Sequence, residues 1–192
     1  AIEQVQFYTV NTYPKKYLLR NHNVSFNYVR RDTIAGAVTD SLHRVDIEMH
    51  KSNPAAFLAR VDTQNTAVLN YFDHIYGATG RTNVKGGAAI ACQSVWRNID
   101  LVYTSNNRGL KMYFIVYPGG NPNDVVLHIK GSRANGISGN NLNFYSNWNG
   151  STFIKPRMYQ YTISGSVVTP VNVCPASWQS LGSDNYGITT TA

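Results

Sequence analysis

Strict alternation of apolar and polar side chains is clearest between residues 44 and 50. Val45, Ile47 and Met49 are apolar, and the positions between them are polar or charged. Because successive side chains of a β-strand point to opposite faces of a sheet, this pattern predicts a strand with one buried face.

Similar short segments follow one another along the chain, separated by residues typical of turns. Residues 17–19 and 24–29 lie on either side of a polar turn, as do residues 142–145 and 152–154, and each pair predicts a β-hairpin. Further strands are predicted at residues 5–10, 88–92, 99–104, 125–130, 159–163 and 167–173.

Two segments suggest something other than a half-buried strand. Residues 54–59 begin with proline and are rich in alanine, which favours a short helical turn. Residues 110–117 are apolar almost without interruption, which predicts a strand that is central in its sheet or buried on both faces.

Short strands that recur roughly every 8 to 12 residues, with Gly, Asn and Pro between them, are typical of sandwiches and barrels. We therefore expect an all-β fold, an antiparallel β-sandwich-like domain with short turns. A chain of 192 residues suits one domain spanning 1–192, with two packed sub-lobes, 1–70 and 71–192, as an alternative.

The composition supports a secreted β protein. Charged residues make up 14% of the chain, against about 25% in an average soluble domain, and Asn, Tyr, Thr, Ser and Gly stand in their place. The sequence contains no run of about 18 apolar residues, so it predicts no membrane-spanning helix. Ala1 at the start of the chain fits either a processed N-terminus or a trimmed chain.

The charge balance changes this interpretation little. Seventeen Lys and Arg against ten Asp and Glu give a net charge of +7 and a pI near 9.5, which is compatible with nucleic-acid binding. However, the basic residues are dispersed, with doublets only at 15–16 and 30–31. We therefore do not expect a nucleic-acid partner.

The two cysteines, Cys92 and Cys174, are too few for a disulfide scaffold or a four-cysteine zinc site. They fit either one disulfide that closes a long loop in an oxidising compartment or two separate buried thiols. The sequence leaves these two alternatives open.

Five segments, in order along the chain, carry a resemblance to a known family: 81–84 (Arg-Thr-Asn-Val), 99–103 (Ile-Asp-Leu-Val-Tyr), 110–116, 118–122 (Pro-Gly-Gly-Asn-Pro) and 156–160. The chain resembles the N-terminal β domain of large secreted bacterial proteins with SBBP-type β-propeller repeats. This resemblance implies an extracellular β module at the cell surface and no known reaction. It is imperfect, because Tyr113 replaces an aspartate of the family pattern and Arg97-Asn98 replaces proline-glycine.

Catalytic motifs are absent from the sequence. It contains no G-x-S-x-G nucleophile motif and no glycine-rich phosphate loop, and Glu3 and Glu48 are its only glutamates. Asp46, Glu48 and His50 share one face of a predicted strand, where a metal could bind. A solvated polar face with Arg44 as charge partner explains these three residues better. We therefore expect no enzyme, no metal and no cofactor.

Two sets of residues are candidates for binding. Trp148 lies between Asn147 and Asn149 in a predicted turn, where it is either an exposed binding residue, for example for surface glycans, or a core anchor. The two ends of the chain are β-prone and weakly charged, which predicts either edge strands of the domain itself or strands that pair with a neighbouring subunit. The interface residues expected at these ends are Ile2, Val5, Phe7, Tyr186 and Ile188.

The expected function is a non-enzymatic structural role at the bacterial cell surface. The chain would be a self-associating subunit of an extracellular filament, sheath or matrix, or an adhesion module, forming a homo-oligomer or polymer through β-edge contacts. The alternatives are a carbohydrate- or ligand-binding β-sandwich and a coat-type protein that packages nucleic acid.

Overall fold

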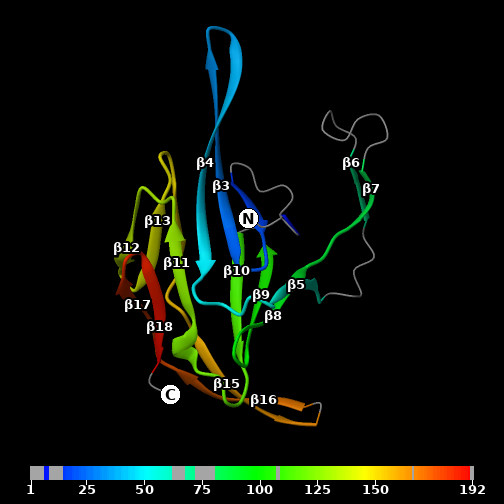
Figure 1. Ribbon diagram of the computed structural model, residues 1–192, viewed down its shortest axis with the longest axis vertical. Coiled ribbons are helices and arrows are strands. Elements are labelled where there is room, and N and C mark those ends of the chain that lie inside the picture. Colours follow the sequence, from blue (N-terminus) through cyan, green and yellow to red (C-terminus); the bar gives the residue numbers. More distant parts are fainter. Residues whose placement is uncertain are drawn as a thin grey trace.

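The computed structural model describes residues 7–8, 15–61, 68–71, 81–106, 109–165 and 167–190. The largest element is a seven-stranded antiparallel sheet in which the first strands of the chain meet the last ones (Figure 1). Its strands, in spatial order, are β1 (Phe7–Tyr8), β2 (Lys15–Leu19), β3 (Asn23–Ile34), β4 (Ala37–Met49), β11 (Val126–Lys130), β18 (Asn185–Thr190) and β17 (Ala176–Gly182).

Two smaller sheets pack against the seven-stranded one. The four-stranded sheet has the order β10 (Gly109–Val116), β9 (Ile99–Asn106), β8 (Ala89–Trp96) and β5 (Phe57–Arg60), and the three-stranded sheet consists of β12 (Ala134–Ser138), β13 (Asn141–Tyr145) and β14 (Gly150–Phe153). Two isolated hairpins complete the strands, β6 (Val68–Tyr71) with β7 (Arg81–Lys85) and β15 (Met158–Ser164) with β16 (Val167–Cys174). In the described part of the chain one 3-10 turn, η1 (Pro122–Asp124), is present, and it precedes β11.

One hydrophobic core joins the three sheets. Val45, Ile47 and Met49 are at most 3% exposed, so the alternation at 44–50 is confirmed. They meet Ile99 and Leu101 of the four-stranded sheet in the same cluster of buried side chains, which also contains Leu142 and Phe144 of the three-stranded sheet. The all-β antiparallel fold expected from the sequence is confirmed, and none of the sheets closes into a barrel. Both larger sheets combine strands from either side of residue 70, so sub-lobes divided there do not correspond to separate sheets.

The β3–β4 hairpin continues beyond the core as a free arm, which rises from the rest of the molecule in Figure 1. Its loop is formed by Ala35 and Gly36, both with positive φ (50° and 82°). Positive φ at both central residues is the requirement of a type I′ turn, whose twist matches that of the strands. Across the arm, Arg31 and Asp40 occupy paired positions and form an ion pair with an Nε–Oδ1 distance of 2.8 Å.

Two local predictions are wrong. The predicted helical turn at 54–59 is a turn followed by β5, because Phe57–Arg60 pairs with residues 90–93 of β8 and this pairing overrides local propensity. The predicted central strand at 110–117 is β10, an edge strand that pairs only with β9 among the described strands. Its side chains do alternate, but the outward-facing Tyr113 and Ile115 are themselves apolar, which hides the alternation.

Candidate functional site

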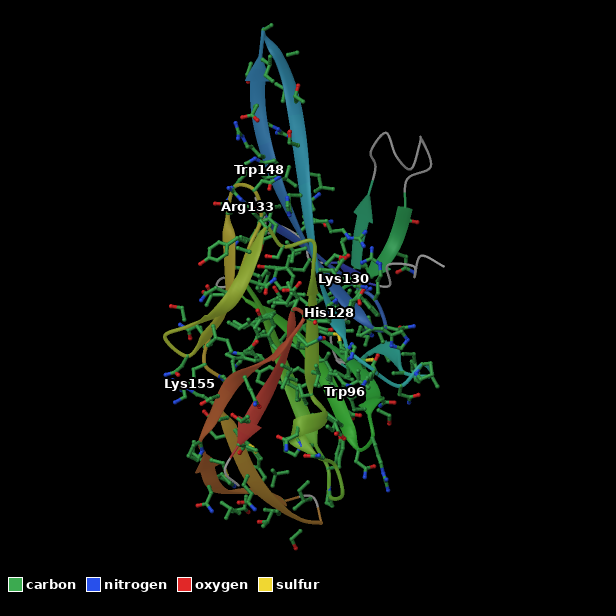
Figure 2. All side chains as sticks on the ribbon, turned by 60° about the vertical axis from the view of Figure 1, so that its left-hand side comes forward. Trp96, His128, Lys130, Arg133, Trp148 and Lys155 are labelled. Carbon is green, nitrogen blue, oxygen red and sulfur yellow. The ribbon has the colours of Figure 1, made fainter. Side chains whose placement is uncertain are left out.

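The Trp148 turn lies at one end of the three-stranded sheet, beside a shallow pocket of about 490 Å³. Figure 2 shows Arg133 and Trp148 next to each other, distant from Trp96 and Lys155. The pocket brings together the three residues predicted from the sequence with five that were not predicted: Arg133, Ala134, Tyr145, Ser146 and Gly150.

Trp148 combines the two alternatives left open by the sequence. Its side chain is half-buried and packs against the core, with its ring edge-on to His43 at a centroid distance of 6.2 Å. The part that stays accessible lines the pocket, and the exposed Asn147 and Asn149 lie on either side of it in the chain. Trp96, in contrast, is a core residue that is 5% exposed.

Ser146 fixes the shape of this turn. It is 5% exposed, and its Oγ accepts hydrogen bonds from the backbone nitrogens of Trp148 (3.2 Å) and Asn149 (2.9 Å) while donating to the Asn149 carbonyl (2.8 Å). The Ser146 backbone nitrogen also donates to that carbonyl at 2.7 Å. These bonds satisfy the turn's backbone internally, so the two asparagine side chains remain available to a ligand.

The start of β14, which forms one wall of the pocket, is tied to the seven-stranded sheet. Lys15 Nζ donates to the Gly150 carbonyl at 2.8 Å, and Tyr28 Oη donates to Ser151 Oγ at 2.6 Å. Burial lowers the pKa of Lys15 and raises the pKa of Tyr28 to about 12. Both groups therefore hold this wall of the pocket in place.

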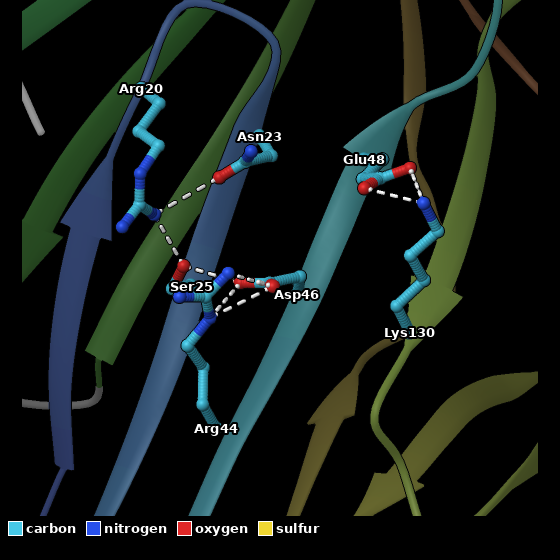
Figure 3. A network of polar contacts seen from close by, with 7 residues as sticks. All are labelled: Arg20, Asn23, Ser25, Arg44, Asp46, Glu48 and Lys130. Atoms are coloured by element: carbon cyan, nitrogen blue, oxygen red, sulfur yellow. Dashed lines mark hydrogen bonds and ion pairs between the residues drawn. The ribbon is translucent and has the colours of Figure 1, made fainter. Parts of the chain in front are cut away.

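The polar face of β4 is occupied by ion pairs (Figure 3). Asp46 binds Arg44 through Nε and Nη2 and accepts a hydrogen bond from Ser25, and Glu48 pairs with Lys130 of β11 at 2.8 Å. Arg44 and Asp46 pair as expected from the sequence. Among the described residues, no three His, Cys, Asp or Glu side chains are grouped as metal ligands would be.

A second surface pocket, of about 590 Å³, lies near the other end of β4 and is lined by residues that include His50, Asp124 and Asn185. His128 lies 6.1 Å from His50 between ring centroids, and its Nδ1 is 3.1 Å from Asn185 Oδ1. Of the two imidazoles only that of His50 lines the pocket, together with the carboxylate of Asp124 and the amine of Lys51. His128 contacts His50 from the neighbouring strand β11.

The two cysteines are separate thiols and not a disulfide, so the bridged alternative is not present. Cys92 is fully buried in β8, where its Sγ contacts the Asn21 carbonyl at 3.2 Å. Cys174 ends β16 in a different sheet, where it pairs with Met158.

The strand-exchange hypothesis for the chain ends is only partly testable, because Ile2 and Val5 lie outside the described residues. Phe7 lies in β1, which is at the edge of the seven-stranded sheet, and packs against the core. The expectation for Tyr186 and Ile188 needs correction, because β18 pairs with β11 on one side and β17 on the other. Tyr186 is buried and Ile188 packs on the core of the same chain, so they offer no free edge to a neighbouring subunit.

Sequence reasoning missed the surface of the β15–β16 hairpin, which we call the apolar ribbon. Tyr159, Tyr161 and Ile163 share one face, and Val173, Pro170 and Val168 are paired opposite them. Val171 is the extra residue at a bulge. Except for Pro170, these side chains are between 47% and 69% exposed. The available signal in the sequence was the lack of any charged residue from 158 to 183.

The search of known proteins adds a family assignment. A model for a family described as a domain of unknown function, DUF7948, matches residues 2–174. The chain belongs to this family. No curated protein and no solved structure matches it. The DUF7948 match includes the Trp148 pocket and the apolar ribbon but ends before β17 and β18.

Among the described residues, the structure contains no helix long and apolar enough to cross a membrane.

Proposed function

We propose that this domain is a non-enzymatic association module of an extracellular surface protein, and that two copies join through the apolar ribbon. The observation that carries the proposal is the exposed apolar face of β15 and β16, which no described strand covers. An exposed apolar face of this kind marks an interaction site more often than an ordinary surface. The resemblance to surface proteins with SBBP repeats supports the extracellular setting.

The area of the ribbon fits such a contact. Multiplying the six exposed fractions by about 150 to 250 Å² for each whole side chain gives roughly 500 to 850 Å². Two copies packed face to face would bury roughly 1,000 to 1,700 Å², which spans the lower limit of specific protein interfaces.

The charge distribution favours a second copy as the occupant. Two molecules that each carry a net charge of +7 repel one another over most of their surfaces. The ribbon has no Asp, Glu, Lys or Arg, so two ribbons can meet without bringing like charges together. In a two-fold contact the same surface faces itself, and an uncharged apolar face is complementary to its own copy.

A filament or sheet would require a second contact, because a two-fold interface alone stops at the dimer. The β3–β4 arm provides a candidate. Val38 and Leu42 lie on one face of the arm, and they are 64% and 63% exposed. Arm contacts between dimers would extend the assembly beyond two chains.

Sedimentation velocity over a range of protein concentrations tests the proposal. The perturbation is Val168→Lys on the apolar face, and the matched control is Thr169→Lys on the neighbouring, opposite face of the same strand. Both variants add one positive charge at an exposed position. Losing one apolar contact and burying an ammonium group costs more than 1.4 kcal/mol, so we expect at least a tenfold weaker association for Val168→Lys.

The control is expected to associate like the wild type. A wild-type chain that stays monomeric up to about 1 mM, where binding is worth only about 4 kcal/mol, would overturn the proposal. Equal effects of the two lysine substitutions would also overturn it, because they would indicate a response to net charge and not to the apolar face.

A further inference from the structure

The Tyr145 ring in the Trp148 pocket is held as a flat platform. Tyr145 pairs with Gly150 across the strands, and a Cβ atom placed on Gly150 would lie 2.8 and 2.9 Å from two ring carbons. The ring therefore lies directly over the glycine, with one face covered by the strand. Tyr145 is 46% exposed, so much of the other side is open to solvent.

The two asparagines of the turn supply hydrogen-bonding groups next to this platform. Asn147 and Asn149 are exposed, and their side-chain amides have no hydrogen-bond partner among the described residues. Each amide presents a donor and an acceptor in one plane. That pattern matches two neighbouring hydroxyl groups, one of which accepts and the other donates.

Arg133 adds a positive charge at the pocket wall. The Arg133 backbone nitrogen donates to the Tyr145 carbonyl at 2.8 Å, and Ser132 Oγ accepts from the Tyr145 nitrogen at 3.0 Å. These two bonds fix the Cα atom of Arg133 next to the Tyr145 ring. In the described part of the chain its guanidinium forms no ion pair; the four ion pairs there use other cations. A guanidinium binds a carboxylate through two parallel hydrogen bonds.

We propose that this pocket binds an acidic saccharide that carries uronic-acid residues. The C–H face of a sugar ring packs on the electron-rich face of Tyr145 and the edge of Trp148. The amides of Asn147 and Asn149 bind its hydroxyl groups, and Arg133 binds its carboxylate. The shallow form of the pocket suits a chain of sugars lying along the surface more than a small molecule that must be enclosed.

A single-stranded nucleic acid also combines stacking with a cation, but it fits this pocket less well. Its charge is repeated along every phosphate, whereas the pocket has one cation, Arg133, and two neutral amides beside it. Neutral amides placed around an aromatic platform are suited to a ligand rich in hydroxyl groups.

Isothermal titration of the full chain with uronic-acid tetrasaccharides tests the proposal. The probes are galacturonate, glucuronate and mannuronate oligomers, each compared with its methyl ester, which keeps the sugar and removes the charge. We expect saturable binding of at least one acid, with a dissociation constant no weaker than about 1 mM. The corresponding ester is expected to bind at least tenfold more weakly.

Three variants assign the contacts. Arg133→Gln should weaken binding of the acid at least tenfold and abolish the preference over the ester, while Arg157→Gln, which removes the same charge at an exposed position outside the pocket, should have no effect. Gly150→Ala should also weaken binding, because the new Cβ displaces the Tyr145 ring. Circular dichroism and thermal melting of each variant check that the fold is intact.

Absence of binding to all three acids would overturn the proposal, as would equal affinity for acid and ester. Equal losses for Arg133→Gln and Arg157→Gln would place the binding elsewhere on the basic surface. A single-stranded oligonucleotide that displaces the saccharide and binds more tightly would assign the pocket to nucleic acid instead. None of these outcomes depends on association through the ribbon, which sedimentation reports separately.

Discussion

A cluster of three phenylalanines attaches the three-stranded sheet to the rest of the fold, and it offers a sharp test of the packing. Phe144 of β13 is completely buried, with its ring centroid 5.0 Å from that of Phe26 on β3 and 5.3 Å from that of Phe153 on β14. The first of these contacts is edge-to-face, at an interplanar angle of 86°. Phe144→Ala removes the central ring of the cluster.

The expected loss is about 4 kcal/mol in the free energy of unfolding. Burying roughly 200 Å² of ring surface at about 25 cal/mol per Å² gives about 5 kcal/mol. Compactness of the unfolded chain lowers this value by roughly 10–40%. The result agrees with the range of about 3 to 5 kcal/mol measured for such truncations. Because a domain is stable by only about 5–15 kcal/mol, the variant should be close to unfolding at moderate temperature.

Guanidinium unfolding followed by tryptophan fluorescence measures this loss. Phe144→Leu is the matched control, since it keeps a large apolar side chain at the site and should cost clearly less than Phe144→Ala. A double-mutant cycle with Phe26→Leu should give a coupling energy of about 0.5 to 1.5 kcal/mol for the aromatic pair. A loss below about 1 kcal/mol for Phe144→Ala, or strict additivity in the cycle, would refute the reasoning that this cluster joins the two sheets.

Three further predictions test other parts of the fold. Burial raises the pKa of Tyr28 from 10.0 to about 12, so its contribution to stability is complete below pH 10 and is lost as the pH rises through 12; unfolding free energies measured across this range should fall less steeply in Tyr28→Phe. Gly131→Ala should destabilise more than Gly36→Ala, because both glycines have positive φ but only the new Cβ at Gly131 meets a backbone oxygen, at 2.7 Å; equal melting temperatures would contradict this. An aromatic disulfide reagent should modify Cys174 in the folded protein and Cys92 only on unfolding. Mass spectrometry locates the label, and equal modification rates at the two cysteines would contradict the burial of Cys92.

Much of the fold could be predicted because the decisive signals are local. The alternation around Val45 and Ile47 gives both the strand and its buried face, and the polar turns give the hairpins. Which distant strand lies next to a hairpin in the sheet is not determined locally. β4 pairs with β11, about eighty residues later, through contacts such as Ile47 with Ile129, and no short sequence pattern specifies that choice. The edge position of β10 was missed for the same reason.

The candidate site was predicted only in part, and for a comparable reason. Trp148 and its asparagines stand out by residue type within one turn. Tyr145 directly precedes the same turn in the sequence. Arg133 joins them through the pairing of β12 with β13, since its backbone nitrogen donates to the Tyr145 carbonyl, and this contact becomes visible only in three dimensions. The apolar ribbon shows the opposite case, since both strands were predicted but their lack of a covering sheet was not. Burial depends on what else packs nearby, and an apolar strand has the same sequence pattern whether or not it is covered.

The spatial order of the seven-stranded sheet has a consequence for how the chain is made. β11 lies next to β4 in the sheet, and β18 lies next to β11. β18 is nevertheless the last described strand of the chain. In a chain that emerges N-terminus first, β4 is present with an open edge long before its neighbours exist, and the main sheet cannot close until residue 190 or so has appeared. A fragment that stops at residue 174, where the family match ends, would lack β17 and β18 and leave the place of Tyr186 in the core empty. The seven-stranded sheet therefore extends beyond the stretch of the chain that the family model matches.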